Sequence, residues 1–146
     1  MTTVAVRLAN KLKEKGYNVD VGLVEAGALL HDVGRSQTHD VDHAAVGGMI
    51  ARNLGLSESV VRIIERHIGA GIPPKEAQNL GLPEGVYTPE TLEEKIVSYA
   101  DKLISGRKEV DISVTIEDFA MRLGWDHPAI ERLHRLQQEM ETLLAN

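Results

Sequence analysis

Two neighbouring residues, His31 and Asp32, close an apolar stretch of the sequence and are the first candidates for chemistry. An adjacent imidazole and carboxylate offer a neutral nitrogen and an anionic oxygen to one point, and this mixed set suits a divalent transition metal. Two ligands hold a metal poorly, so a site needs more of them. His43, His67 and Asp101 follow in the sequence and are the further candidate ligands.

Each candidate also has an ordinary structural explanation when it is taken alone. The helix dipole favours a histidine such as His67 in the last turn of a helix, and His43 would be a first-turn residue. A buried Asp101 could form a salt bridge with an arginine, because a buried carboxylate is costly without a cation or several donors. The candidates taken together favour the metal interpretation, because helical bundles build sites from residues that converge from several helices.

The apolar spacing predicts the helices that must position these residues. Periodicity and end signals place them at residues 4–15, 21–32, 43–54, 58–67, 75–80, 89–104, 116–123 and 128–144. The predicted N-caps are Asp20, Asp42, Ser57, Thr88 and Thr115. Two glycines inside the third helix, Gly47 and Gly48, predict a close approach to another helix or to a ligand.

The composition favours one helical domain. The chain has 146 residues, of which 42% are hydrophobic but only 3% aromatic, so Leu, Ile, Val and Ala must fill the core. We expect a single domain over residues 1–146, with a motif-bearing part at 1–105 and a two-helix C-terminal tail at 106–146. The proline- and glycine-containing stretch at 73–88 is expected to cross the surface and could act as a lid.

The composition also excludes several functions. Without cysteine there can be no disulfide or thiolate metal site, and a net charge of −6 argues against general nucleic-acid binding. No apolar run approaches a membrane span and no export signal is visible, so we expect a cytoplasmic protein. A homodimer is possible through the Leu133, Leu136, Met140 and Leu143 stripe, although such a stripe is more often part of the core.

The ordered motifs resemble those of the HD-domain metal-dependent phosphohydrolase superfamily, which is named for its adjacent His-Asp pair. Residues 29–35 (LLHDVGR) resemble its central motif, and residues 98–103 (SYADKL) resemble the segment that supplies its last Asp ligand. Residues 43–47 and 64–67 are similar to the histidine segments of subgroups that can hold two metals. The resemblance spans roughly residues 4–105 and implies an all-α helical bundle of about seven to eight helices.

The resemblance implies hydrolysis of a small phosphate ester, a nucleotide or a phosphodiester, by a metal-activated water. The implied ligands of one or two divalent ions (Mn, Fe, Co, Ni, Zn or Mg) are His31, Asp32, Asp101, His43 and His67. Asp32, as the bridging residue, and His67 are the candidate catalytic residues. The candidates to bind the substrate phosphate are Arg35, Arg66 and Lys102, each explained equally well as a surface cation.

One departure from the family pattern concerns the first helix. The family begins with a histidine there, and this chain has no histidine before His31. Either the chain as given lacks the first turns of that helix, which we favour, or this member has lost a ligand. The second case supports an alternative hypothesis, a non-catalytic HD-like module that binds a nucleotide, a metal or a protein partner. For an enzyme, base stacking would fall to Tyr87, Tyr99 or aliphatic side chains.

Overall fold

Eight α-helices make up most of the part of the chain that the structure describes, and the predicted all-α fold is confirmed. The computed structural model describes residues 1–145. Its elements are α1 (Thr2–Glu14), α2 (Val21–Leu30), a 3₁₀ turn η1 (Val33–Ser36), α3 (His43–Asn53), α4 (Glu58–Glu65), α5 (Pro74–Asn79), α6 (Leu92–Lys102), the hairpin strands β1 (Ile104–Ser105) and β2 (Lys108–Glu109), α7 (Ile112–Leu123) and α8 (Pro128–Ala145). In these residues no helix combines the length and the apolarity needed to cross a bilayer.

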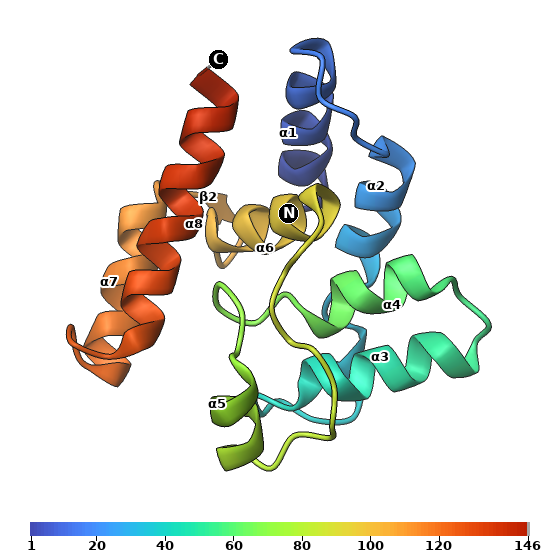
Figure 1. The fold of residues 1–146 in the computed structure, drawn as a ribbon, viewed down its shortest axis with the longest axis vertical. Helices are drawn as coiled ribbons and strands as arrows, with labels where there is room; N and C mark the ends of the chain where they lie inside the picture. Colours follow the sequence, from blue (N-terminus) through green and yellow to red (C-terminus); the bar gives the residue numbers. More distant parts are fainter. Residues whose placement is uncertain (146) are drawn as a thin grey trace.

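Helix α6 lies in the middle of the bundle, where α1, α2, α4 and α8 pack around it (Figure 1). Ile96, Val97 and Ala100 are fully buried, which explains why this helix occupies the centre. A capping box fixes its start, because the Thr91 side chain accepts from the Glu94 N–H while the Glu94 side chain returns to the Thr91 backbone. The helix therefore carries its last turn, with Asp101, into the interior.

Helix α2 ends just before the His-Asp pair. The Asp20 side chain caps its start by accepting from the Leu23 N–H at 3.0 Å, as predicted. Gly27 lies so close to α4 that an added Cβ would be 2.6 Å from the Ile63 side chain. This tight packing sets the carboxyl end of α2 beside the carboxyl end of α4, although α2 ends at Leu30, two residues earlier than predicted.

The 3₁₀ turn η1 rests directly on α3. A Cβ on Gly34 would lie 1.8 Å from the His43 carbonyl oxygen and 2.7 Å from the Gly47 nitrogen. Gly47 in turn faces Ile64 of α4, whose side chain would be 2.8 Å from an added Cβ. The close approach predicted from the helix glycines is therefore confirmed, and it brings Asp32 next to the first turn of α3.

The two C-terminal helices, α7 and α8, pack into the main core. Leu133, Leu136 and Met140 of α8 are buried in the same apolar cluster as residues of α1 and α6. The stripe is thus intramolecular core, the explanation that the sequence favoured over a dimer contact. Thr115 of α7 donates to the Lys102 carbonyl at 2.6 Å, so α7 is also tied to the end of α6.

Two predicted helix starts are wrong. Helix α6 begins at Leu92 and not after Thr88, because the Thr91–Glu94 capping box provides the stronger start. Helix α7 begins at Ile112 and not after Thr115, because the Asp111 side chain accepts from the Ser113 N–H at 2.9 Å. In both cases the sequence contains another capping residue that forms the actual N-cap, Thr91 for α6 and Asp111 for α7.

The segment expected to cross the surface is anchored at both ends. The Ile72 N–H donates to the Tyr87 carbonyl at 2.9 Å, and the Tyr87 hydroxyl donates to the Pro83 carbonyl at 2.7 Å. Ile72, Ala77 and Tyr87 form a small buried cluster of their own. The segment is thus a packed unit, and its helix α5 forms one wall of the cavity described below.

Candidate metal centre

Three histidines take their orientation from the chain just before them. The Nδ1 of His31 contacts the Ala28 carbonyl oxygen at 2.7 Å, that of His43 the Asp40 oxygen at 2.9 Å, and that of His67 the Ile64 oxygen at 2.7 Å. A carbonyl oxygen can only accept, so each Nδ1 carries a proton, and in the neutral form of each imidazole the Nε2 presents its lone pair. A hydrogen bond from the nitrogen that does not face the metal is the usual way in which proteins orient a metal-binding imidazole.

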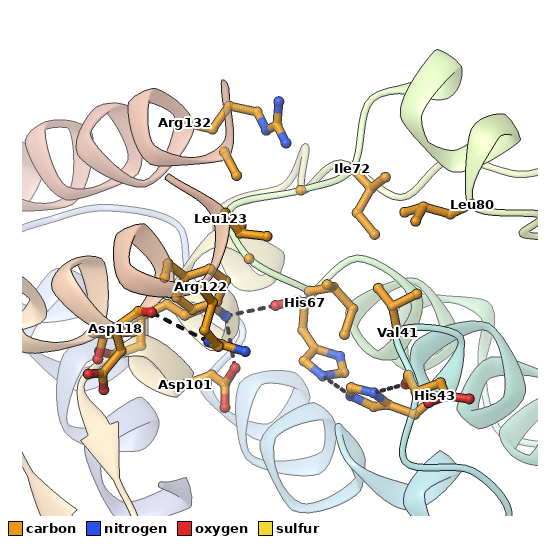
Figure 2. A pocket seen from close by; sticks show the side chains of 18 of the residues that line it. Val41, His43, His67, Ile72, Leu80, Asp101, Asp118, Arg122, Leu123 and Arg132 are labelled. Carbon is orange, nitrogen blue, oxygen red and sulfur yellow. Dashed lines mark hydrogen bonds and ion pairs between the residues drawn. The ribbon is translucent and has the colours of Figure 1, made fainter. Parts of the chain in front are cut away.

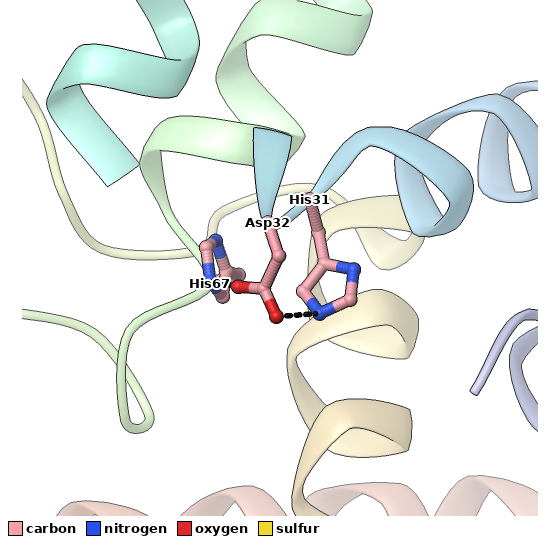
Figure 3. Close-up of side chains that lie close together, drawn as sticks. All are labelled: His31, Asp32 and His67. Carbon is pink, nitrogen blue, oxygen red and sulfur yellow. Dashed lines mark ion pairs between the residues drawn. The ribbon is translucent and has the colours of Figure 1, made fainter. Parts of the chain in front are cut away.

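All three Nε2 atoms converge on the Asp32 carboxylate. Asp32 Oδ2 lies 3.2 Å from His31 Nε2. Its other oxygen, Oδ1, lies 3.2 Å from His43 Nε2 and 3.3 Å from His67 Nε2, and these two nitrogens are 3.1 Å apart. Figure 3 shows Asp32 between His31 and His67. The carboxylate thus faces one imidazole with one oxygen and two imidazoles with the other.

Asp101 completes the group on the His31 side. Its Oδ1 lies 3.3 Å from His31 Nε2, while its Oδ2 accepts from Lys102 Nζ at 2.8 Å. Two sets of candidate ligands therefore share Asp32. The first contains His31, Asp32 and Asp101, and the second contains His43, His67 and Asp32.

The donor chemistry of these sets fits a cation. In the second set two imidazole lone pairs and a carboxylate oxygen face one another at 3.1–3.3 Å, although all three are acceptors. Such an arrangement is repulsive unless a proton or a metal ion lies between the atoms. Atoms bound at about 2.0–2.2 Å to one ion lie roughly 3.0–3.5 Å apart, which is the spacing found here. His31, Asp32 and His67 also meet as a compact group of possible ligand atoms.

Burial and mutual contacts shift the protonation of the cluster. Burial alone would lower the pKa of His31, but hydrogen bonds to Asp101 and Asp32 outweigh it and raise this pKa to about 9. Burial alone would raise the pKa of each carboxyl group. Contacts with the three histidines nevertheless hold the pKa of Asp32 well below its usual value, and Lys102 with His31 does the same for Asp101. Burial lowers the pKa of His67. Both carboxylates are therefore anionic at neutral pH and suited to hold a cation.

The predicted phosphate-binding cations have different surroundings. Arg35 lies beside the candidate metal ligands, with its Nε 3.3 Å from Asp32 Oδ1, and about half of its side chain is exposed. The structure does not bring Arg66 to this place, because its guanidinium donates to Glu94 at 2.9 Å and to the Val86 carbonyl. Lys102 is buried, and its Nζ already has three acceptors: the His67 carbonyl, the Ser98 carbonyl and Asp101. Its visible role is to tie α6 to the end of α4.

A cavity of about 780 Å³ opens from the candidate metal centre toward α5, α7 and α8 (Figure 2). Arg132 of α8 reaches across it and forms two bonds with Glu76 of α5, at 2.8 and 3.1 Å. Arg122 of α7 also lines it. Neither arginine was predicted from the sequence, since their positions depend on how α7 and α8 fold back over the site.

The aromatic lining also differs from the prediction. Tyr87 and Tyr99, expected to supply base stacking, are buried and do not line the cavity. Phe119 of α7 lines it instead. A signal was available, because Phe119 and Arg122 are three residues apart on the predicted helix at 116–123 and therefore share a face.

Comparisons with known proteins agree with this architecture. The family model for the HD domain matches residues 1–106. An uncharacterized protein of Methanocaldococcus jannaschii, MJ0778, is 54% identical over 140 residues, which cover 96% of this chain and 83% of that protein. The tRNA (cytidine(56)-2'-O)-methyltransferase of Thermoplasma volcanium is 43% identical over 97% of this chain, which spans 40% of that enzyme's length. The HD domain of the Listeria monocytogenes phosphodiesterase PgpH shares the fold, with a TM-score of 0.53 at 16% identity over 99% of this chain and 88% of that one.

Proposed function

The chain belongs to the HD-domain family, and from this premise we propose that it is a metal-dependent phosphohydrolase. The observation that carries the proposal is the pair of ligand sets that share Asp32, in which three imidazole nitrogens and two carboxylates converge at 3.1–3.3 Å. Such a cluster suits one or two divalent ions.

The residues of the chain have distinct parts in the proposed reaction. His31, Asp32 and Asp101 would hold one ion, and His43 and His67 would hold a second one together with Asp32. When bound, a divalent ion supplies an activated water and positive charge beside the phosphoryl oxygens. Arg35 lines the cavity next to Asp32, so its guanidinium is placed to bind a phosphate oxygen and to orient the substrate.

We propose that the substrate is a small phosphate ester of the nucleotide or phosphodiester class. The cavity of about 780 Å³ is far larger than a phosphate group, and drug-sized ligands occupy pockets of this order. The proposal retains the expectation of a cytoplasmic enzyme for which Mn, Fe, Co, Ni, Zn and Mg are all candidate ions.

Metal analysis combined with a generic substrate tests the proposal. The purified chain is loaded with each candidate ion, bound metal is measured by mass spectrometry, and hydrolysis of bis(p-nitrophenyl) phosphate is followed. We expect bound metal and turnover in the wild type, and loss of both in Asp32→Ala with helical circular dichroism retained. Glu25→Ala, an exposed position on α2, is the matched control. Bound metal without hydrolysis of any phosphoester would contradict the proposal.

A second candidate is a non-catalytic module that works with a tRNA-modifying enzyme. The observation that favours it is the match to a tRNA methyltransferase in which the region similar to this chain is less than half of the protein. Fluorescence anisotropy with labelled tRNA distinguishes the two. Binding that persists in Asp32→Ala, in a chain without phosphohydrolase activity, would favour the module.

A further inference from the structure

The cavity beside the metal centre is lined by four lysine and arginine side chains, and three of them already have carboxylate partners. Arg35 faces Asp32, Lys102 bonds to Asp101, and Arg132 bonds to Glu76. Arg122 is the fourth. In residues 1–145 Arg122 forms no ion pair with a carboxylate. Of the four cations that line the cavity, it is therefore the one without a carboxylate partner in these residues.

The surroundings of Arg122 leave its terminal nitrogens available. Its Nε donates weakly to the Asp118 backbone oxygen at 3.4 Å, and its guanidinium carbon lies 4.8 Å from the centre of the Phe119 ring. The ring supports one face of the guanidinium, while the two terminal nitrogens have no hydrogen-bond partner in the part of the chain that the structure describes. Figure 2 shows Arg122 on the same side of the cavity as Asp101.

Helix α7 holds Arg122 in this position through contacts of its own. Ile116 and Ala120 bury the opposite side of the helix in the main core, and Thr115 ties its first turn to the end of α6. The HD-domain family model covers residues 1–106, so the cavity wall formed by Phe119 and Arg122 of α7, here called the Arg122 wall, lies beyond the part of the chain that this model describes. The metal centre and the Arg122 wall therefore come from separate stretches of the sequence.

We propose that Arg122 is a specificity residue that binds a second phosphate of the substrate, beyond the one that is hydrolysed. This inference rests on the proposed function, in which the ligand sets around Asp32 act on the first phosphate. A guanidinium binds phosphate through two parallel hydrogen bonds, and stacking on Phe119 leaves the edge needed for them. An anionic substrate in a protein of net charge −6 needs such a cation. The substrate class that fits is a phosphodiester that carries a second phosphate group, and the dinucleotide pApA serves as its probe.

Kinetics with and without the second phosphate test this assignment. The dinucleotide pApA carries the terminal phosphate, whereas bis(p-nitrophenyl) phosphate offers a single phosphodiester. For Arg122→Ala we expect kcat/KM to fall about 10- to 100-fold on pApA and less than about 3-fold on bis(p-nitrophenyl) phosphate. Arg122→Lys should be intermediate on pApA, because it keeps the charge and loses the paired geometry. An equal loss on both substrates, or no loss on pApA, would overturn the assignment.

The matched control is Arg135→Ala. Arg135 is an exposed arginine on α8 that bonds to Glu131 one turn earlier and does not line the cavity. Its removal should leave both kcat/KM values unchanged.

A binding measurement separates this inference from the proposed function. Phosphorothioate-linked pApA and ApA, which resist hydrolysis, are titrated calorimetrically into the wild type and Arg122→Ala, each loaded with the same ion. We expect the wild type to bind pApA at least about tenfold more tightly than ApA and the variant to lose this preference. A wild type without the preference would overturn the inference whatever its activity. A preference without turnover would contradict the proposed function and leave the role of Arg122 standing.

Discussion

At the scale of single residues, the raised pKa of His31 couples metal binding to pH. In the metal-free protein His31 is protonated at neutral pH, because its contacts with Asp101 and Asp32 raise its pKa to about 9. A metal ion needs the neutral imidazole and must displace this proton. We expect the apparent metal affinity to rise about tenfold per pH unit between pH 6.5 and 9 and to level off above pH 9. Competition with a chromophoric chelator across this range measures it, and a flat profile would contradict the assignment.

The same group gives the metal-free protein a stability that depends on pH. The folded-state pKa of His31 lies above its usual value of 6.5, so the folded protein binds this proton more tightly than the unfolded chain does. This stabilising contribution is present in full below pH 6.5 and is lost as the pH rises through 9. Denaturant unfolding in the presence of a metal chelator would reveal this loss.

Arg66 provides a second test at this scale, because it was a candidate for phosphate binding and instead bonds to Glu94. Both side chains are largely buried, with exposed fractions of 12% and 3%. Arg66→Ala would leave the Glu94 carboxylate without its cation, and we expect the free energy of unfolding to fall by about 2–4 kcal/mol. Metal affinity should stay within about twofold of the wild type. Urea denaturation and metal titration measure the two effects, and a specific loss of phosphoester binding in a stable variant would restore the earlier hypothesis.

At the scale of elements, the contact between η1 and α3 sets the distance from Asp32 to His43. Gly34→Ala would place a methyl group against the His43 carbonyl, which is backbone and cannot rotate away. We expect a loss of about 2 kcal/mol or more in the free energy of unfolding, together with weaker metal binding. Thermal unfolding and metal titration check both.

Gly22→Ala is the comparison for this prediction. Gly22 lies in α2, where an added Cβ would meet a single neighbour at an ordinary distance, 3.6 Å from Asp20 Oδ1. This substitution should leave stability unchanged or raise it by up to about 1 kcal/mol. Equal effects of the two substitutions would show that the close approach at Gly34 does not constrain the site.

The sequence was enough to identify most of the helices, but it placed their ends less accurately. Helix α2 was recognisable from its apolar run and its Asp20 cap, and the glycines at 47 and 48 already indicated close packing. The start of α6 was misplaced because Thr88 and Thr91 are both acceptable caps, and the reciprocal bond from Glu94 decides between them. Local chemistry thus predicts that a helix forms, while competition between neighbouring caps determines where it begins.

At the scale of the whole molecule, the candidate ligands could be predicted and the cavity wall could not. His31, Asp32 and Asp101 lie in recognisable motifs, and convergence of α2 and α6 follows from their apolar surfaces. Arg122 belongs to no motif, and its position depends on α7 folding back over the end of α6. The bond from Thr115 to the Lys102 carbonyl that fixes this arrangement involves a backbone atom, which no residue pattern identifies.

The integration of α8 into the core gives a prediction at this scale. Leu133 is fully buried against the helices that hold the metal centre. Leu133→Ala should lower the free energy of unfolding by about 2–5 kcal/mol, because it removes apolar contacts and leaves a cavity. Arg135→Ala, on the exposed side of the same helix, should change it by less than about 1 kcal/mol. Guanidinium denaturation compares them, and a small effect at Leu133 would contradict the shared core.

Arg122 follows Asp101, the last candidate metal ligand, in the sequence, and this order has a consequence for how such proteins can diversify. Under the proposed function the candidate metal ligands lie in residues 1–106 and Arg122 lies in residues 107–146, so an exchange of this last stretch that keeps its core contacts would keep the reaction and change the substrate. The hairpin at Gly106 offers protein engineers a junction at which to graft new helices onto an unchanged candidate metal centre.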